Sequence, residues 1–271
     1  MIKHCMKYLL SLILAIVLLI SCQKEDRNFE IAHKFISFSP NISQTDTRAT
    51  DEYSLSVSDY FHACPTVTVR MIIGNEVKTA KYIYKADTKK LEYVDGAPLY
   101  YPEDNSPPYQ LIISWPDAET RTQLGEADYR HQEDENSFIR CDMLSDTVNN
   151  AVKVEYLPIY FKHLKSKLTL IPALSGEDAT DVAFTNLTVN GYKPFHNTAN
   201  SNVVNIYQLI YNPSIEAETT ISNNKVAVRL ATNKDTEIEY HFRFDASNLK
   251  AGENREIKIL IPLSFLYYEF E

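Results

Sequence analysis

Glycine is scarce in this sequence, with only 6 residues in 271. Loops that cradle phosphate and the strand-to-helix turns that expose a catalytic serine need several glycines at fixed spacings. Neither a Gly-x-Ser-x-Gly elbow nor a zinc-binding His-Glu-x-x-His motif occurs. We therefore expect a protein without catalytic residues, without a cofactor and without a bound metal, rather than an enzyme.

Long apolar runs are also few, and the longest spans Leu9 to Ile20. These 12 residues are fewer than the ~20 that a membrane-spanning helix needs. Lys3 and Lys7 precede the run and Ser21-Cys22 follows it, which is typical of a signal peptide that ends in a lipobox. We predict a signal peptide over residues 1–21 and lipidation of Cys22, which would anchor the protein in a membrane.

Positive charge is in deficit once this segment is removed. The remaining 271 − 21 = 250 residues carry 27 − 2 = 25 basic and 36 acidic side chains, a net charge of −11. Such a surface repels phosphate backbones, so nucleic acid is not an expected partner. Residues 22–31 read as a charged tether, and Gln23 to Asp26 resemble the export signal of surface-exposed outer-membrane lipoproteins.

Only two cysteines, Cys64 and Cys141, remain in the region expected to fold. A disulfide between them and two unpaired buried thiols are both compatible with this count. His62 and Cys64 offer a weak thiolate–imidazole pair, and His131 to Glu135 a weak cation site. For both segments, ordinary packing or a solvated loop is the favoured interpretation.

Strict alternation of apolar and polar residues covers most of the chain beyond the tether and predicts an all-β protein. Thr66 to Ile73, Val77 to Lys85 and Leu91 to Val94 read as a meander with turns at Gly74-Asn75 and Asp95-Gly96. Glu237 to Phe244 and Glu256 to Ile261 repeat the pattern. Strands with one buried and one wet face favour antiparallel sandwiches.

The middle of the chain is more polar and less regular. Tyr53 to His62 has room for one or two helical turns, and a polar stretch runs from Ala118 to Asn136. Phe138 to Leu144 and Asp146 to Asn150 read as further strands. We place a boundary near residue 155, which predicts two tandem sandwich domains over residues 32–155 and 156–271.

Aromatic residues are plentiful, with 18 tyrosines and 12 phenylalanines. Most suit a sandwich core. Tyr100, Tyr101, Tyr109 and Trp115 flank a proline-rich segment and form the best candidate for an exposed loop that stacks on sugars. A monomeric surface glycan-binding lipoprotein is therefore the alternative function.

Several segments together resemble the fimbrillin family, the Mfa-like or FimA-type pilin lipoproteins of type V pili. Ile36 to Thr50 is similar to the family's leading strand and its Thr-Arg-Ala site, and Phe161 to Leu170 to its Phe-x-His strand. Phe184 to Tyr192 and Leu249 to Ile259 resemble its glycine turn and its closing Ala-Gly hairpin. The resemblance implies two transthyretin-like sandwich domains and a role in adhesion as a fimbrial subunit at the cell surface.

The resemblance also implies a mechanism of assembly. An arginine-specific protease would cut between Arg48 and Ala49, releasing the leading strand over 32–48 and leaving 271 − 48 = 223 residues. If Phe35, Ile36, Phe38 and Ile42 fill a groove, its vacancy costs about 6 to 12 kcal/mol, which a strand from another pilin subunit can recover. Leu263 to Glu271 is a short donor strand, so stalk, tip and anchor positions all stay open.

Overall fold

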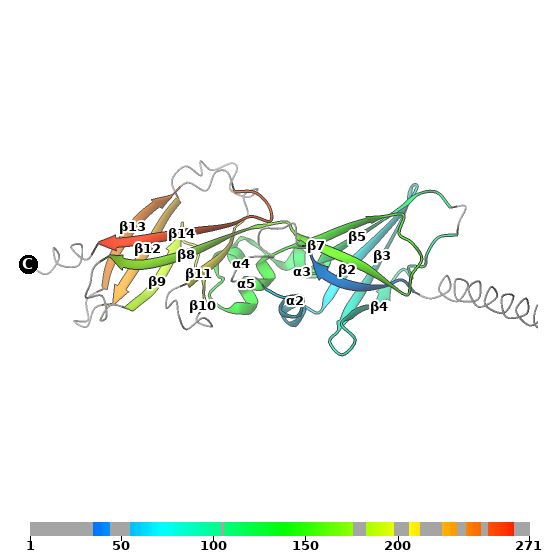
Figure 1. Ribbon diagram of the computed structural model, residues 1–271, viewed down its shortest axis with the longest axis horizontal. Coiled ribbons are helices and arrows are strands. Elements are labelled where there is room, and N and C mark those ends of the chain that lie inside the picture. The colour runs from blue at the N-terminus through cyan, green and yellow to red at the C-terminus, as the bar shows by residue number, and fades with distance from the viewer. Residues whose placement is uncertain are drawn as a thin grey trace, which may run out of the picture. The chain divides into compact units, whose positions relative to one another are not determined.

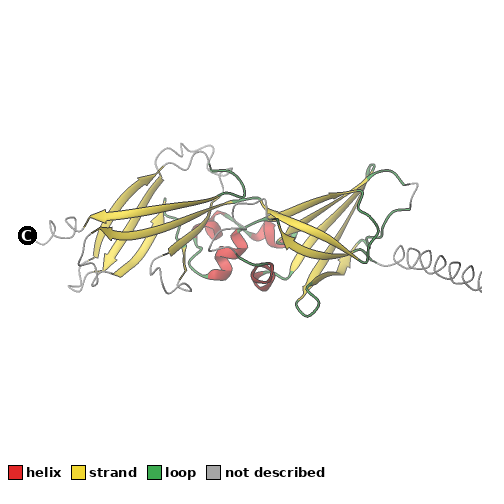
Figure 2. Cartoon of the chain, in the orientation of Figure 1, coloured by secondary structure: helices red, strands yellow, loops and turns green. Residues whose placement is uncertain are grey.

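The computed structural model describes residues 35–43, 55–103, 106–175, 183–197, 206–211, 224–231, 237–244 and 249–262. Its contacts separate into two compact units: Met1–Pro40 with Thr68–Ile113 and Thr147–Ile159, and Asn41–Val67 with Ser114–Asp146 and Tyr160–Glu271. Strands dominate both (Figures 1 and 2), so the predicted all-β class is confirmed at this level. The predicted lipidation site Cys22 and the predicted processing site between Arg48 and Ala49 lie outside the described residues.

Seven strands form a closed barrel in the order β1-β4-β3-β2-β5-β6-β7. Their bounds are β1 Ser37–Ile42, β2 Thr66–Ile73, β3 Glu76–Lys85, β4 Lys90–Gly96, β5 Tyr109–Trp115, β6 Leu144–Asn149 and β7 Tyr156–His163. The sequence predicted β2, β3 and β4 as a meander, and β3 pairs antiparallel with β4 through Tyr84 and Leu91. The closed order differs from the separate two-sheet sandwich predicted for this part of the chain.

Alternation along these strands builds the core of the first unit. Val69 and Met71 of β2, Tyr82 of β3, Leu91 of β4 and Leu111 of β5 are all buried. Gly96 ends β4 with φ +91°, and a Cβ there would lie 2.6 Å from the carbonyl oxygen of Thr79. Only glycine fits this turn without a shift of the backbone.

The described residues of the second unit include four short helices (Figure 2): α2 Val57–Ala63, α3 Ala118–Gln123, α4 Glu126–Arg130 and α5 Glu135–Cys141. The prediction of a strand over Phe138 to Leu144 is wrong for its first part. Asp134 accepts a hydrogen bond from the Ser137 N–H and starts a helix, whose residues Phe138, Ile139 and Cys141 are buried at helical spacing. The prediction over Asp146 to Asn150 agrees with β6.

Two further sheets share one core in the second unit. One has the order β10-β11-β8-β14 and the other β13-β12-β9. Their bounds are β8 Ser166–Ser175, β9 Ala183–Val189, β10 Phe195–Asn197, β11 Ile206–Tyr211, β12 Asn224–Ala231, β13 Glu237–Phe244 and β14 Asn254–Pro262. The core holds leucines 168, 170, 187 and 209 with Ile259 and Ile261.

One pairing in this sandwich departs from the antiparallel arrangement that the sequence predicted. β14 runs parallel to β8, with Ile257 opposite Leu170. Parallel neighbours need a long crossover connection, and the chain between β8 and β14 provides one by forming β9 to β13. The boundary near residue 155 between two tandem domains stays a prediction.

Gln132 is a buried polar side chain that takes the place of a strand beside β11. Its amide nitrogen donates to the carbonyl oxygens of Tyr129 at 2.8 Å and Ile210 at 3.0 Å, and its oxygen accepts from the Ile210 N–H at 2.8 Å. β10 covers only Ile206 to Gln208 of this edge. Gln132 therefore satisfies the main chain just beyond the end of β10.

Among the described residues, no helix is long and apolar enough to cross a membrane.

Candidate functional site

Strand β1 occupies the barrel position between β4 and β7, which we call the β1 slot. Phe38 lies opposite Leu91 of β4 in an antiparallel pair. The Ile36 N–H donates to the carbonyl oxygen of Leu99 at 3.0 Å, and the Ser43 N–H to that of Phe161 at 2.8 Å. This is the strand that the sequence predicted to fill a groove.

Two of the predicted groove fillers are fully buried. Ile36 is 1% exposed and Phe38 is 0% exposed. The Phe38 ring meets the Tyr82 ring edge-on, with centroids 5.1 Å apart. At about 1.5 to 3 kcal/mol for each buried large side chain, these two contribute about 3 to 6 kcal/mol.

Phe35 and Ile42 contribute less than the sequence estimate assumed. Ile42 is half-buried, and Phe35 is 40% exposed. Phe35 instead stacks on the rings of Tyr93 and Tyr100, with centroids 4.4 and 5.2 Å away. The estimate of 6 to 12 kcal/mol for four fully buried residues was therefore too high, because Phe35 lies at the mouth of the slot and not inside it.

The main chain of β1 lacks one hydrogen-bond donor. Pro40 is buried within the strand and has no N–H to donate to a neighbour. Lys90 of β4 supplies a side-chain contact, since its Nζ donates to Ser39 Oγ at 3.0 Å. Side-chain burial therefore carries a large share of what keeps β1 in place.

The aromatic residues predicted to form an exposed glycan-binding loop differ in how far they are buried. Trp115 is 0% exposed, and its Nε1 donates to the carbonyl oxygen of Cys64 at 2.7 Å. Tyr101 is also buried, and Tyr109 is half-buried with its hydroxyl bonded to the carbonyl oxygen of Ala151. The prediction of an exposed aromatic loop is wrong for Trp115 and Tyr101, whereas Tyr100 is 42% exposed.

The cysteines are unpaired and serve packing. Cys64 and Cys141 are both free and buried. The Cys64 sulfur lies 3.8 Å from the Asp117 carboxylate, and His62 points to solvent. Burial, followed by the charge of Asp128, raises the pKa of Cys141 to about 12. That thiol stays protonated at neutral pH and is a poor nucleophile.

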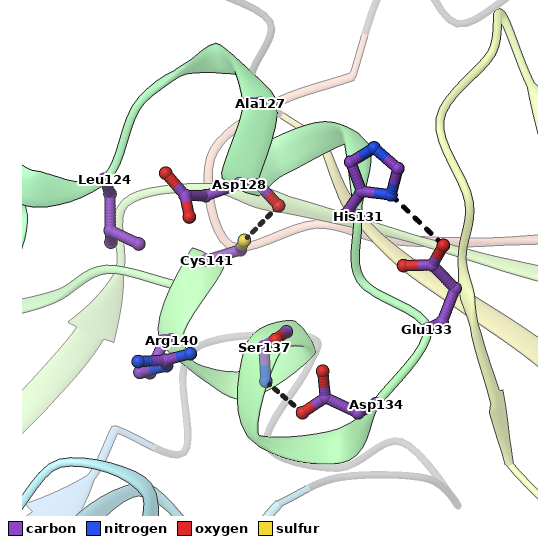
Figure 3. Close-up of a pocket in the computed structure, with 9 residues that line it drawn as sticks. All are labelled: Leu124, Ala127, Asp128, His131, Glu133, Asp134, Ser137, Arg140 and Cys141. Carbon is purple, nitrogen blue, oxygen red and sulfur yellow. Dashed lines mark hydrogen bonds and ion pairs between the residues drawn. The ribbon is translucent and has the colours of Figure 1, made fainter.

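A cleft of about 300 Å³ lies beside α4 and α5 (Figure 3) and includes His131, Glu133 and Asp134 of the predicted cation loop. Both carboxylates already have protein partners. Glu133 accepts from His131 at 3.2 Å and pairs with Lys193 at 3.1 Å, while Asp134 caps α5. In the part of the chain that the structure describes, no three His, Cys, Asp or Glu side chains are placed to hold a metal ion.

The Phe-x-His motif of β7 has a structural role. Phe161 packs against Phe61, and the His163 Nδ1 lies 2.7 Å from the Asp142 carboxylate. The Tyr60 hydroxyl donates to the same carboxylate oxygen at 2.9 Å. All these groups are buried, so they join α2, α5 and β7 without facing a ligand.

Sequence reasoning missed the residues that line the slot, namely Tyr82, Leu91 and Tyr93. Their signal was the alternation in β3 and β4, which identifies buried faces but not their neighbours. Which strand lies beside β1 depends on barrel closure, because β1 pairs with β4 and not with the next strand in sequence.

The fold is similar to that of solved proteins from Bacteroides. A candidate cell adhesion protein from Bacteroides uniformis matches with a TM-score of 0.52 and 16% identity, covering 85% of this chain and 95% of that one. Another from Bacteroides ovatus matches with a TM-score of 0.53 and 12% identity, covering 86% and 94%.

A fimbrial protein from Bacteroides ovatus also aligns, at 12% identity and a TM-score of 0.47, and this chain spans 49% of its length. No protein-family model matches the sequence, and no curated protein matches it. At these identities the likeness to the two cell adhesion proteins concerns the fold alone.

Proposed function

We propose that this protein is a fimbrial subunit, or an accessory or tip pilin, that acts in adhesion at the cell surface. In this proposal it is exported as an outer-membrane lipoprotein anchored through Cys22. Its partners are other pilin subunits, which it joins by donor-strand addition after an arginine-specific protease cuts behind Arg48. The fold shared with cell adhesion proteins supports the general role, and strand β1 supports the mechanism.

The observation that carries the proposal is the burial of Ile36 and Phe38 on one short strand near the N-terminal end of the described chain. Removing β1 would open the barrel between β4 and β7 and expose both strand edges together with the two apolar pockets. Extended peptides bind such edges through main-chain hydrogen bonds, and alternate side chains enter the pockets. A strand from another subunit would recover the burial energy lost with β1.

The missing main-chain donor at Pro40 favours the exchange of β1 for another strand. An incoming strand with an ordinary residue in place of Pro40 gains one main-chain donor that β1 lacks. The exchanged state would then bury equivalent side chains and satisfy one more edge group. The donor within this chain would be Leu263 to Glu271, and its short length leaves stalk, tip and anchor positions open.

Replacing Arg48 tests the proposal directly. We expect Arg48→Ala to fold and reach the membrane but not to enter polymers that resist heating in detergent. Arg48→Lys, which keeps the charge but removes the arginine, serves as the matched control and should fail equally. Mass spectrometry of the N-terminus should find Ala49 in polymers of the unaltered protein and acylated Cys22 in both variants. Normal polymers of Arg48→Ala would refute the mechanism and leave a monomeric glycan-binding role as the alternative.

A further inference from the structure

Exposed apolar side chains gather at one end of the barrel in the first unit. The described residues include nine exposed large apolar side chains, and five of these nine belong to that end: Phe35, Val77, Val94, Tyr100 and Val152. Single exposed apolar residues are ordinary in any protein, whereas a cluster marks an interaction surface. We call these five residues the apolar patch.

Strand directions place the first members of the apolar patch together. β1 begins where β4 ends, because the two strands are antiparallel with Phe38 opposite Leu91. The Ala97 N–H donates to the carbonyl oxygen of Thr79 at 2.9 Å, so the end of β4 also lies beside the beginning of β3. The residue before β1, the end of β4 and the start of β3 therefore share one end of the barrel.

The connections from β4 to β5 and from β6 to β7 complete this end of the barrel (Figure 1). Tyr100 belongs to the first connection and Val152 to the second. The Tyr101 hydroxyl donates to the carbonyl oxygen of Val154 at 3.1 Å and joins the two connections. Tyr100 in turn stacks on Phe35, which ties them to the start of β1.

The segment that leads to the predicted lipid anchor also leaves the barrel at this end. Phe35 is the first described residue, and 35 − 22 = 13 positions separate it from Cys22. A chain of 13 residues spans at most about 45 Å. Acyl chains on Cys22 would hold the apolar patch within that distance of a lipid surface, which makes the lipid surface a partner that is always near.

Charge at this end gives no reason for attraction to anionic headgroups. The described charged residues around the apolar patch are the acids Glu76, Asp95, Glu103 and Glu155 and the bases Lys78 and Lys153. Glu76 and Lys78 lie 3.4 Å apart as an ion pair. Contact with lipid would therefore depend on burial of apolar side chains, and tyrosine is a residue favoured at the interface between headgroups and acyl chains.

We propose that the apolar patch lies on the membrane that holds the Cys22 anchor. This inference uses the proposed lipid anchor and does not depend on strand exchange. Acyl chains alone would leave the barrel free to turn on its tether, whereas the apolar patch gives it one orientation. The end that carries Tyr100 and Val152 then faces the lipid, and the turn between β3 and β4 at the other end of the barrel faces away.

A fluorescent label compares the two ends of the barrel in the acylated full chain. The Arg48→Ala background keeps the chain uncut, and Val152→Cys or Asp87→Cys carries an environment-sensitive dye. Asp87 is exposed in the turn between β3 and β4, while Cys64 and Cys141 are buried. In vesicles of phosphatidylcholine and phosphatidylethanolamine, we expect iodide to quench the label at position 152 at least about threefold less than the label at position 87. Nitroxide-labelled lipids should quench the two labels in the opposite order.

Weakening the apolar patch without changing the anchor is the second test. With the dye on Val77→Cys, the changes Val94→Ser and Tyr100→Ser together should raise quenching by iodide at least about threefold. Leu260→Ser is the matched control, because Leu260 is 62% exposed in the second unit, and it should have no effect. Adding anionic lipid or raising the salt concentration should change little. Equal urea midpoints confirm that the variants fold.

Mass spectrometry of Cys22 distinguishes failure of the anchor from failure of this inference. A chain without acyl groups on Cys22 would overturn both. An acylated chain whose label at position 152 is quenched by iodide as strongly as the label at position 87 would overturn the membrane contact alone. Protection that disappears when the protein is diluted in excess lipid would assign the apolar patch to a second copy of the chain, which also overturns the membrane contact.

Discussion

Phe38→Ala separates the contribution of β1 to stability before the proposed cleavage at Arg48 from its contribution afterwards. The side chain is fully buried and packs edge-on against Tyr82, so truncation leaves a cavity in the barrel. Buried Phe→Ala changes cost about 3 to 5 kcal/mol in free energy of unfolding. Because β1 leaves the barrel in the proposed assembly, the same change should have no effect on the finished polymer.

Urea unfolding of the uncut, soluble protein measures the first quantity. With a slope of about 2 kcal/mol per M, a loss of 3 to 5 kcal/mol lowers the midpoint by about 2 M. Phe35→Ala is the matched control, since its ring is 40% exposed and should cost about 1 kcal/mol. The second quantity is the temperature at which polymers dissociate in detergent, which should equal that of the unaltered protein.

Two results would refute this reasoning. A precursor destabilised by less than 1 kcal/mol would mean that Phe38 does not hold the barrel closed. Polymers of Phe38→Ala that dissociate at a clearly lower temperature would mean that β1 remains in the assembled subunit. The variant should also exchange its strand faster, because its own strand is held less firmly than that of the unaltered protein.

Two other predictions concern the second unit. Gln132→Ala should lower the free energy of unfolding by about 2 to 4 kcal/mol, because it leaves the main chain of Ile210 unpaired in a buried place. The control Gln110→Ala loses an exposed hydrogen bond and should cost less than about 0.5 kcal/mol. Thermal unfolding compares the two variants, and equal losses would contradict the role of Gln132. The pKa of Cys141 is raised from its ordinary 9.0 to about 12, so the protonated thiol favours the folded state below pH 9 and this contribution disappears as the pH rises toward 12. Cys141→Ala should therefore show a weaker fall in stability between pH 9 and 12 in urea titrations, and identical profiles would exclude the effect.

Alternation of apolar and polar residues predicts the strands well because successive side chains of a half-buried strand lie on its buried and its exposed face in turn. β2 begins and ends where the pattern of Val67, Val69 and Met71 placed it. The same rule was available for Trp115, which continues the buried positions Leu111 and Ile113 of β5. Its position beside a proline-rich segment suggested exposure instead, and the periodicity was the better guide.

Other features could not be read in this way. The short apolar run at the end of α5 predicts a strand, whereas the capping pair Asp134 and Ser137 is the signal for the helix. The parallel pairing of β14 with β8 cannot be predicted from the alternation of apolar and polar residues, since parallel and antiparallel strands both bury every second residue. The stacking of Phe35 on Tyr93 and Tyr100 joins residues that lie far apart in the sequence.

The side-chain amide of Gln132 also protects the edge of β11 from pairing with other strands. In the proposed assembly a subunit gains a strand from its neighbour and must not accept it at the wrong edge, because exposed main-chain groups are templates for unintended pairing. β10 is only three residues long, so part of the β11 edge would be such a template. By bonding both main-chain groups of Ile210, Gln132 closes that edge with a single side chain. Loss of the Gln132 side chain should therefore produce disordered aggregates in addition to a less stable subunit.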